Sequence, residues 1–409
     1  MEFSAEDLKE LPIVMTSMSR WDGDFSSASW SLAKTFSKEQ TVIYVDYPYT
    51  LFDFIRERKR DSVRKRKTAL LWGKKSLKPL PECGIKLYAL TPPLMLPVNW
   101  LPAGRFYNFL ASLNDKRLAK SIQKALRTLG YVDFIFFNSF NPLYLSDAPD
   151  EASVYVYQSR DNIRALEPYL RKHGADSEIK AIRKAHLSLA TSKRLQQDLT
   201  ERSGKKVAFF PNAADFGLFR KAFEESIAVP EELKNIPTPI IGYTGNICHR
   251  LDYQLIQSIC QYHNDKSVVL VGPRNHWGHT GIDLDQIPNL YFIGPKSIYE
   301  LPSFLAHFDI LILPFLCNEV TKSIYPLKIN EYLASGKPVV ATPFSEDILL
   351  FKNHIRLKKN EEAFNRAIIE EIKDNTEEKA KARYNLASQN TWEHRIQQFW
   401  ELLFQTFSL

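Results

Sequence analysis

Residues 323–342 read SIYPLKINEYLASGKPVVAT and place a helix, a turn and a strand in one short segment. Pro326 stands where the helix is expected to begin, because proline favours the first helical positions. The run from Leu327 to Leu333 continues as the helix, and Gly336 ends it. Lys337–Thr342 then has the apolar, β-branched composition of a strand. A helix followed at once by a buried strand is typical of an α/β sheet.

The first turn of this helix has the properties of an anion site. The backbone N–H groups of Leu327, Lys328 and Ile329 are expected to have no acceptor within the helix, and such groups bind phosphate. Lys328 places a cation where the helix dipole is already positive, which costs about 0.3–1 kcal/mol unless an anion is bound. Glu331, one turn further, could accept hydrogen bonds from a ribose diol. The pattern therefore indicates a nucleotide site, and an ordinary helix of an α/β sheet is the alternative.

Short apolar runs alternate with amphipathic stretches along most of the chain, as in parallel sheets covered by helices. In the first half the expected strands are Pro12–Met18, Thr41–Tyr47, Ile85–Leu90, Val132–Asn138, Ser153–Ser159, Leu187–Ser192 and Lys206–Pro211. In the second half they are Pro239–Gly245, Ser267–Gly272, Leu290–Gly294, Phe308–Pro314 and Pro338–Thr342. We therefore expect an α/β fold made of two Rossmann-like, doubly wound domains.

Composition suggests where the domains end. Residues 216–238 are charged and proline-containing and show no strong strand, so they are expected to connect a first domain, residues 1–215, to a second, residues 239–390. Residues 391–409 predict an amphipathic helix with an aromatic stripe. We expect this helix to pack back on the first domain, with docking on its own domain as the alternative.

Several familiar signatures are missing from the chain. There is no GxGxxG, GxxxxGK[ST], HExxH or GxSxG, so dinucleotide, P-loop, zincin and α/β-hydrolase functions lose their main support. Two Rossmann-like domains without a dinucleotide fingerprint require another kind of ligand.

Ser323–Thr342 resembles the nucleotide-sugar motif of the retaining GT-B glycosyltransferases of family 4. Other segments agree with that family in order and spacing. They are FFPNAADFGLF (209–219), IGYTGNICHRLDY (241–253), VVLVGP (268–273), NLYFIGP (289–295) and FDILILPF (308–315). The resemblance covers nearly the whole chain and includes the teichuronic-acid and other surface-polysaccharide transferases. It implies the GT-B architecture, in which an interdomain cleft holds the active site.

The resemblance also implies roles for individual residues. Glu331 would bind the donor ribose, and the amides of Leu327–Ile329, with Lys328, would hold the diphosphate. The other residues assigned to donor binding are Gly245, Asn246, His249, Arg250 and Arg274. Three features depart from the family. Ser323 replaces a glutamate that touches the donor sugar, so Glu319 or Thr321 could take its place; His249 and Arg250 occupy the first loop instead of its usual Arg and Lys; and Ala213 replaces a glycine.

Catalytic and acceptor residues are expected in both domains. Ser323 and Lys328 are candidate catalytic residues, and so is Asp161, which follows a strand at the edge where open α/β sheets bind ligands. A solvated helix cap is the alternative for Asp161. The loop after the first strand, residues 17–28, could bind the acceptor through Arg20, Trp21, Asp22 and Asp24.

Neither a metal nor a cofactor is expected, apart from the nucleotide-sugar co-substrate. Asp283-Leu284-Asp285 matches the DxD metal signature of another glycosyltransferase architecture. Such a short pattern arises easily by chance, and here it lies in an expected loop.

The charge is concentrated in one segment. The chain of 409 residues carries a net charge of +7, and Arg56–Lys78 alone holds eleven Lys/Arg against two acids. Because the rest of the chain is slightly acidic, nucleic acid is not an expected partner. Basic residues next to Trp72, Met95 and Trp100 instead suit an anionic membrane surface. A solvated loop is the alternative.

The chain is expected to be cytoplasmic and peripheral on the inner face of the cell membrane. No apolar run reaches about 18 residues, the N-terminus lacks the plan of a signal peptide, and the four cysteines are scattered. We expect a metal-independent glycosyltransferase that moves a sugar, with retention, from a nucleotide-diphosphate sugar to a glycan or lipid-linked acceptor in cell-surface polysaccharide biosynthesis. A nucleotide-sugar 2-epimerase and a non-catalytic GT-B-like subunit are the alternatives.

Overall fold

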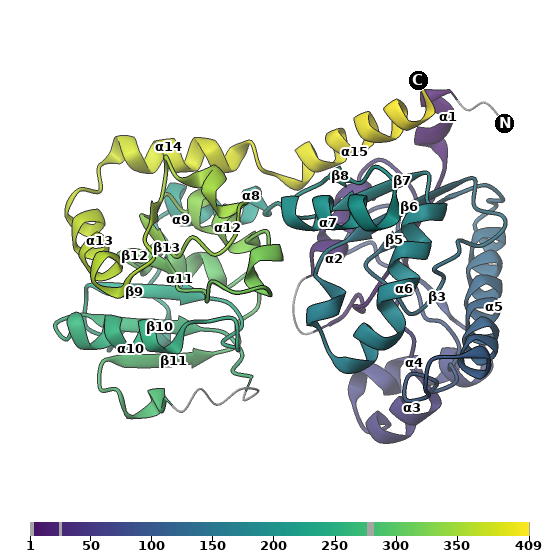
Figure 1. Ribbon diagram of the computed structural model, residues 1–409, viewed down its shortest axis with the longest axis horizontal. Helices are drawn as coiled ribbons and strands as arrows, with labels where there is room; N and C mark the ends of the chain where they lie inside the picture. The colour runs from purple at the N-terminus through teal and green to yellow at the C-terminus, as the bar shows by residue number, and fades with distance from the viewer. Residues whose placement is uncertain (1–3, 24–26, 276–281, 409) are drawn as a thin grey trace. The chain divides into compact units, whose positions relative to one another are not determined.

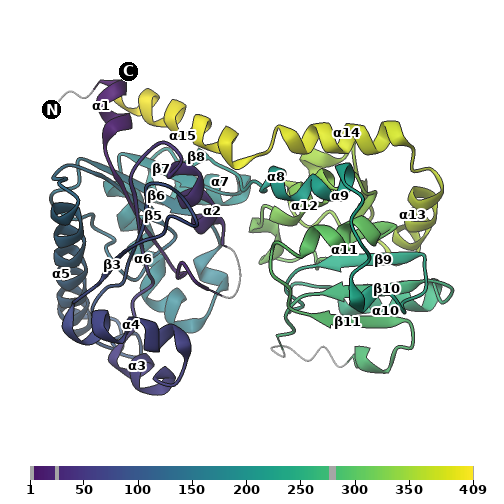
Figure 2. The same ribbon diagram turned by 180° about the vertical axis from the view of Figure 1, so that it is seen from behind.

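The computed structural model describes residues 4–23, 27–275 and 282–408, and the chain divides into two compact units. Unit 1 comprises residues 1–211 and 396–409, and unit 2 comprises residues 212–395. Figures 1 and 2 show that each unit is a sheet covered by helices. In the described residues, no helix is both long enough and apolar enough to cross a membrane.

Unit 1 is built on an eight-stranded sheet. Its strands are β1 (Ile13–Ser17), β2 (Val42–Val45), β3 (Leu77–Pro79), β4 (Leu87–Leu90), β5 (Ile135–Ser139), β6 (Val154–Ser159), β7 (Leu187–Ala190) and β8 (Ala208–Phe209). They lie in the order β3-β4-β2-β1-β5-β6-β7-β8, and only the pair β3–β4 is antiparallel. The central strands are buried along their length, which explains their continuous apolar runs.

The helices of unit 1 lie between these strands along the chain, apart from the first, which precedes β1. They are α1 (Ala5–Glu10), α2 (Ala28–Phe36), α3 (Leu51–Glu57), α4 (Asp61–Trp72), α5 (Arg105–Thr128), α6 (Pro168–Lys184) and α7 (Lys193–Ser203). The C-terminal helix α15 (Trp392–Phe407) begins in unit 2 and joins unit 1 from Ile396. Its Phe399 ring lies 5.1 Å from Phe36 and 5.6 Å from Phe137, so the aromatic stripe is buried in unit 1.

Unit 2 is built on a six-stranded sheet in which every pair is parallel. Its strands are β9 (Ile240–Thr244), β10 (Ser267–Val271), β11 (Leu290–Gly294), β12 (Ile310–Leu313), β13 (Val339–Ala341) and β14 (Arg356–Leu357), in the order β11-β10-β9-β12-β13-β14. The order reverses between β9 and β12. Open α/β sheets bind ligands outside the carboxyl ends of the strands at such a reversal.

The helices of unit 2 include two in the segment that was expected to be a connection. They are α8 (Phe216–Phe219), α9 (Lys221–Glu224), α10 (Tyr253–Tyr262), α11 (Leu301–His307), α12 (Leu327–Ala334), α13 (Glu361–Lys373) and α14 (Glu377–Ser388). The expectation for residues 216–238 is corrected, because this segment is part of unit 2. Phe219 is fully buried, and a Cβ added to Gly336 would lie 2.5 Å from the Phe223 ring.

Candidate functional site

The helix α12 begins at the carboxyl edge of the unit 2 sheet, after β12. Pro326 precedes its first residue, as expected, and contributes no side-chain cap. The N–H of Ile329 donates to the Pro326 carbonyl at 3.1 Å, so this amide is occupied within the turn. The expected anion cradle is therefore corrected: it consists of the amides of Leu327 and Lys328, at the two helix positions before Ile329.

Lys328 and Glu331 lie side by side on α12. The Lys328 ammonium is 3.2 Å from Glu331 Oε2, and the two side chains are 26% and 3% exposed. Burial raises the pKa of Glu331 above its ordinary value, and the nearby Lys328 charge opposes that shift. A buried carboxylate that contacts one cation keeps further acceptor positions, and a ligand can donate hydrogen bonds to them.

The loop after β9 lies against this helix. Gly245 has a φ of 143°, and its N–H donates to the Val271 carbonyl at 2.8 Å. A Cβ at Gly245 would lie 3.1 Å from Lys328 Cε, so the loop backbone and the lysine are in close approach. A Cβ at Gly272 would lie only 1.9 Å from the Gly245 carbonyl oxygen. Two glycines at strand ends therefore allow β9, β10 and α12 to meet.

The rest of this loop is held by backbone contacts. The Asn246 carbonyl accepts from the Tyr243 hydroxyl at 3.1 Å, and the Arg250 carbonyl accepts from the Leu316 N–H at 2.9 Å. The side chains of Asn246 and His249 are exposed, and Arg250 is half-buried. The structure thus keeps the predicted donor residues of this loop together at the carboxyl edge of β9.

Arg274 lies next to the same loop but is engaged elsewhere. It pairs with Ile247 in a parallel bridge, and its guanidinium forms two bonds to Asp285, at 2.5 and 3.2 Å. The guanidinium also lies 4.0 Å from the centre of the Phe292 ring. To contact a diphosphate, Arg274 would have to leave Asp285.

The DxD pair has structural roles. Asp283 Oδ1 accepts the N–H of Asp285 at 3.0 Å and caps a short 3-10 helix, while Asp285 holds Arg274. In the described part of the chain, no group of three His, Cys, Asp or Glu side chains is arranged to hold a metal ion. The two carboxylates are therefore directed to protein partners.

Ser323 and its two suggested substitutes differ in accessibility. Ser323 is 4% exposed, and Thr321 is fully buried, with its hydroxyl donating to the Leu316 carbonyl. Glu319 is 76% exposed on its side chain and lies 2.5 Å from Lys322. Of the three, Glu319 has the exposure to approach a bound sugar.

Tyr332 is a site residue that sequence reasoning did not single out. Its hydroxyl accepts the Thr244 N–H at 2.8 Å and lies 3.2 Å from the Thr244 carbonyl, so it ties α12 to the end of β9. The signal for it is present in the sequence, because a buried tyrosine next to Glu331 must find a partner for its hydroxyl. The sequence does not indicate which strand provides that partner.

The predicted acceptor loop of unit 1 is held by an ion network. The Asp22 carboxylate binds Arg66 through two bonds of 2.5 and 2.7 Å, and Arg66 Nε lies 2.8 Å from Asp46. The Trp21 N–H donates to Asp46 Oδ1 at 3.1 Å. Burial raises the pKa of Asp46, and the charge of Arg66 opposes the shift. Asp22 therefore positions the loop and has little capacity left for an acceptor.

Arg20 is also engaged within unit 1. Its Nε donates to the Tyr47 carbonyl at 3.0 Å, and its guanidinium lies 3.5 Å from the centre of the Tyr49 ring. Trp21 lies below Lys78, whose ammonium is 4.6 Å from the ring centre. Asp24 lies outside the described residues. Trp21 is half-buried, so part of its ring remains open to a ligand.

Asp161 follows β6 at the carboxyl edge of the unit 1 sheet. The preceding residue, Arg160, has a buried Nε for which the described residues supply no acceptor, and burial lowers the pKa of its guanidinium. Asp161 belongs to unit 1, whereas Ser323 and Lys328 belong to unit 2. The three predicted catalytic residues are therefore not assembled within either unit.

Comparisons with known proteins concern both the sequence and the fold. Residues 238–374, which include β9 and α12, match the family model described as glycosyl transferases group 1. A segment of 184 residues is 28% identical to TuaH of Bacillus subtilis (strain 168), whose name refers to a teichuronic acid biosynthesis glycosyltransferase. That segment is 43% of this chain, and it spans only 45% of the length of TuaH.

Solved structures resemble the whole chain. HepE of Anabaena, in complex with UDP, gives a TM-score of 0.60 at 16% identity, with 97% of this chain and 100% of that chain covered. Sucrose-phosphate synthase from Thermosynechococcus elongatus gives 0.64 at 13% identity, with 98% and 100% covered. An alpha,alpha-trehalose-phosphate synthase from Burkholderia vietnamiensis gives 0.65 at 11% identity, with 98% of each chain covered. These similarities show that the chain has the GT-B fold expected from the sequence.

Proposed function

Because residues 238–374 match the family model of the group 1 glycosyltransferases, we propose that this protein transfers a sugar from a nucleotide-diphosphate sugar to a glycan or lipid-linked acceptor. The observation that carries the proposal is the meeting of Gly245, Lys328 and Glu331 inside the matched segment. A buried carboxylate, a cation and a helix N-terminus are the groups that a ribose and a diphosphate require.

The donor is proposed to bind unit 2 at the carboxyl edge of β9. Glu331 accepts the ribose hydroxyls, and the amides of Leu327 and Lys328 receive the diphosphate. Lys328 now pairs with Glu331 at 3.2 Å, so donor binding exchanges this contact for two contacts with the ligand. Uridine diphosphate is the first nucleotide to test, because HepE was solved with UDP and with UDP-glucose.

The chemistry is proposed to be transfer with retention and without a metal. As the glycosidic bond breaks, negative charge builds on the leaving diphosphate, and donors already in place stabilise it. The Lys328 ammonium and the first amides of α12 provide such donors. Asp161, Ser323 and either Arg250 or Arg274 remain proposed participants.

The acceptor is proposed to be part of a surface polysaccharide, either as a glycan or on a lipid carrier. The similarity to TuaH supports this choice. An enzyme that extends a lipid-linked sugar benefits from attachment to the inner face of the membrane, and Arg56–Lys78 is the proposed contact with anionic lipid. Ten of the eleven basic residues of that segment are exposed; Arg66 is the exception.

The deciding experiment measures donor binding and transfer separately. Thermal shift with UDP and with the other nucleoside diphosphates identifies the base, and the matching nucleotide sugars are then tested for hydrolysis and for transfer to membrane lipid extracts. Release of nucleotide diphosphate with transfer of the sugar supports the proposal. Conversion of the donor to a sugar epimer, with no transfer, would assign a 2-epimerase. If no nucleotide shifts the melting temperature of this protein, the proposed donor site is wrong.

A further inference from the structure

Large apolar side chains are exposed in one part of unit 1. Six of the 17 large apolar side chains that are exposed in the described residues lie on α3 or within residues 100–109. On α3 they are Leu51, Phe52 and Ile55, each at least 50% exposed. At the start of α5 and just before it they are Phe106, Phe109 and Trp100, at 66%, 60% and 75%. Soluble proteins rarely leave so many apolar side chains exposed together without a partner.

The topology places these two groups at one edge of the sheet. The helix α3 follows β2, and Trp100 and α5 follow β4; because β2 and β4 are parallel neighbours, both connections leave the same edge. Hydrogen bonds link the two groups through Met95 and Leu96. The Leu51 N–H donates to the Met95 carbonyl at 3.0 Å, and the Leu96 N–H donates to Asn114 of α5 at 2.8 Å.

The structure divides the residues that were expected at the membrane contact into exposed and buried ones. Met95 is 1% exposed and Arg66 is 5% exposed, so the earlier expectation that both belong to a membrane contact is wrong. Trp72 and Trp100, each 75% exposed, do reach solvent, and so do the large apolar side chains of α3 and of the first two turns of α5. The apolar side chains of α3 and α5 were not predicted to belong to this surface, because which face of a helix is exposed depends on its packing in the fold.

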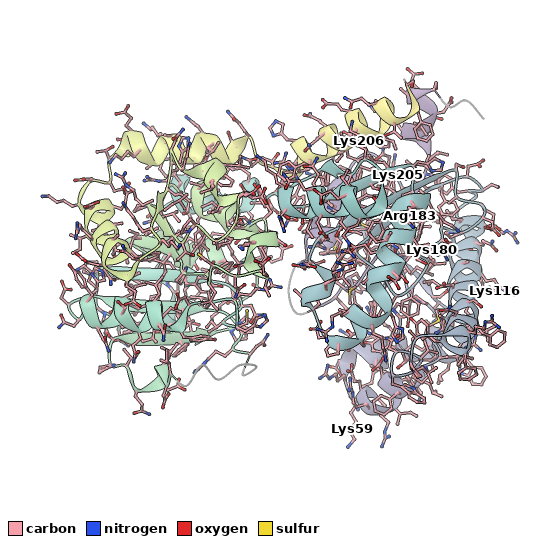
Figure 3. The ribbon with its side chains drawn as sticks, viewed as in Figure 1. Lys59, Lys116, Lys180, Arg183, Lys205 and Lys206 are labelled. Carbon is pink, nitrogen blue, oxygen red and sulfur yellow. The ribbon has the colours of Figure 1, made fainter. Side chains whose placement is uncertain are left out.

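Positive charge surrounds the same edge. Arg56, Arg58, Lys59 and Arg60 lie on or directly after α3, and Arg105 is the first residue of α5; all five are exposed. The Arg56 guanidinium lies 5.7 Å from the centre of the Phe52 ring, so charge and aromatic surface are in contact. Figure 3 shows Lys59 pointing outward at one extremity of unit 1, whereas Lys205 and Lys206 lie at the opposite end of that unit.

We propose that this face of unit 1 docks on an anionic lipid bilayer by inserting Phe52, Ile55, Trp100, Phe106 and Phe109 into the headgroup region, with the surrounding cations at the lipid phosphates. Apolar insertion and electrostatic attraction act together here, as stable reversible attachment requires. The inference deepens the proposed membrane contact of the transferase. It predicts binding that salt weakens but does not abolish.

The test uses the full chain and vesicles of phosphatidylcholine with or without phosphatidylglycerol. The variant carries Phe52→Ser, Ile55→Ser, Phe106→Ser and Phe109→Ser, all at exposed positions, so its melting temperature should match the wild type. We expect sedimentation with anionic vesicles to weaken about tenfold or more, because apolar burial is lost. The wild type should also keep measurable binding at about 1 M salt, where the Debye length is about 3 Å.

Matched controls test whether the loss of binding is specific to this face or follows from replacing any exposed apolar side chain. Ile85 and Val132 are 87% and 74% exposed and precede β4 and β5, so they lie at the opposite edge of the same sheet. Ile85→Ser with Val132→Ser should leave vesicle binding unchanged. Lys206→Glu should do the same, whereas Lys59→Glu with Arg60→Glu should weaken binding most at low salt.

A direct readout comes from Trp100. Lipids brominated in the acyl chain should quench part of the tryptophan fluorescence in wild type and much less in Trp100→Phe. The inference is overturned if the serine variant binds like wild type, if salt removes all binding, or if Trp100 is not quenched. It is also overturned if the serine changes only convert a dimer to a monomer, since a second copy would then cover this face. Because vesicle binding needs no donor, its loss and the loss of donor binding are separate results.

Discussion

The N–H of Thr244, the last residue of β9, donates to the Tyr332 hydroxyl at 2.8 Å, and that hydroxyl lies 3.2 Å from the Thr244 carbonyl. The buried Tyr332 hydroxyl thus provides a partner for both backbone groups of Thr244 and ties α12 to the end of β9. Gly245 comes next in the chain, and Glu331 precedes Tyr332 in the helix. The position of the candidate donor site depends on this contact.

Tyr332→Phe should therefore loosen the donor site. The change leaves two buried backbone groups of Thr244 without a partner, which costs about 1–3 kcal/mol of stability. Donor binding should weaken as well, because the loop after β9 would no longer be held against α12. Urea unfolding and nucleotide titration measure the two effects. Tyr262→Phe, at a side chain 52% exposed, is the matched control and should change neither.

Glu331 and Lys328 are expected to act at different stages. Glu331→Ala removes the proposed ribose acceptor and should weaken donor binding about ten- to a hundredfold, while the fold is kept. Lys328→Ala should mainly lower kcat, by about a hundredfold or more, because its charge is proposed to act on the departing diphosphate. Isothermal titration and steady-state kinetics separate the two results.

Lys322→Ala, at an exposed lysine before α12, serves as the control for these two variants. Wild-type affinity in Glu331→Ala together with wild-type kcat in Lys328→Ala would remove α12 from the mechanism. An unchanged fold should be verified first by circular dichroism, because both variants are judged on function.

Gly272→Ala should damage unit 2 through a backbone clash. The new Cβ would lie 1.9 Å from the Gly245 carbonyl oxygen, at a φ of 150° that side chains rarely adopt. A loss of at least about 2 kcal/mol in the stability of unit 2 is expected, with loss of donor binding. Gly217→Ala is the control, since its nearest neighbour would be 3.6 Å away. Equal melting temperatures for the two variants would contradict the close approach of the two loops.

EDTA is expected to leave transfer activity unchanged. Asp283 and Asp285, the carboxylates that match a metal signature, bind a backbone N–H and Arg274. Asp285→Asn should therefore act through Arg274, which it frees, and should not create a requirement for added Mn²⁺ or Mg²⁺. Activity assays with and without EDTA give the answer. Activity lost with EDTA and restored by Mn²⁺ would make these two aspartates the metal ligands.

The sequence predicted the sheets better than it predicted the site. Apolar runs such as Phe308–Pro314 correspond to β12 because a strand buried on both faces needs continuous apolar residues. The strands β3 and β14 were not predicted, since β14 has only two residues and both are edge strands with little apolar content. Such short strands form because a neighbouring strand pairs with them, and the local sequence pattern does not show that pairing.

The sequence predicted contacts between residues that are close in the chain, but not the long-range contacts that hold the candidate site residues in place. Lys328 and Glu331 are three residues apart on a helix, so their proximity follows from helical geometry. The pairing of Asp22 with Arg66 joins residues 44 positions apart, and no spacing rule indicates it. For the same reason Arg66 was placed on the surface with its basic neighbours, although two carboxylates hold it inside.

Glu178 predicts a measurable pH dependence of unit 1. It is 4% exposed on α6, accepts the Ser159 hydroxyl at 2.7 Å and the Tyr157 hydroxyl at 3.2 Å, and makes no ion pair within the described residues. Burial raises its pKa from 4.5 to about 7, although the two hydroxyl donors favour the charged form. The folded protein therefore holds this proton more tightly than the unfolded chain.

Stability should accordingly fall as the pH rises from about 4.5 to about 7, by up to about 1.4 kcal/mol per pH unit for this group. Glu178→Gln keeps an acceptor for both hydroxyls and cannot ionise, so it should remove this part of the slope and be more stable than wild type at pH 8. Asp115, whose pKa burial raises to about 6, contributes in the same direction and remains in both proteins. The difference between urea unfolding curves of wild type and variant at several pH values therefore isolates Glu178. Asp176→Asn, at an exposed position of the same helix, should leave the slope unchanged. An equal slope in Glu178→Gln would mean that Glu178 titrates in the folded protein as it does in the unfolded chain.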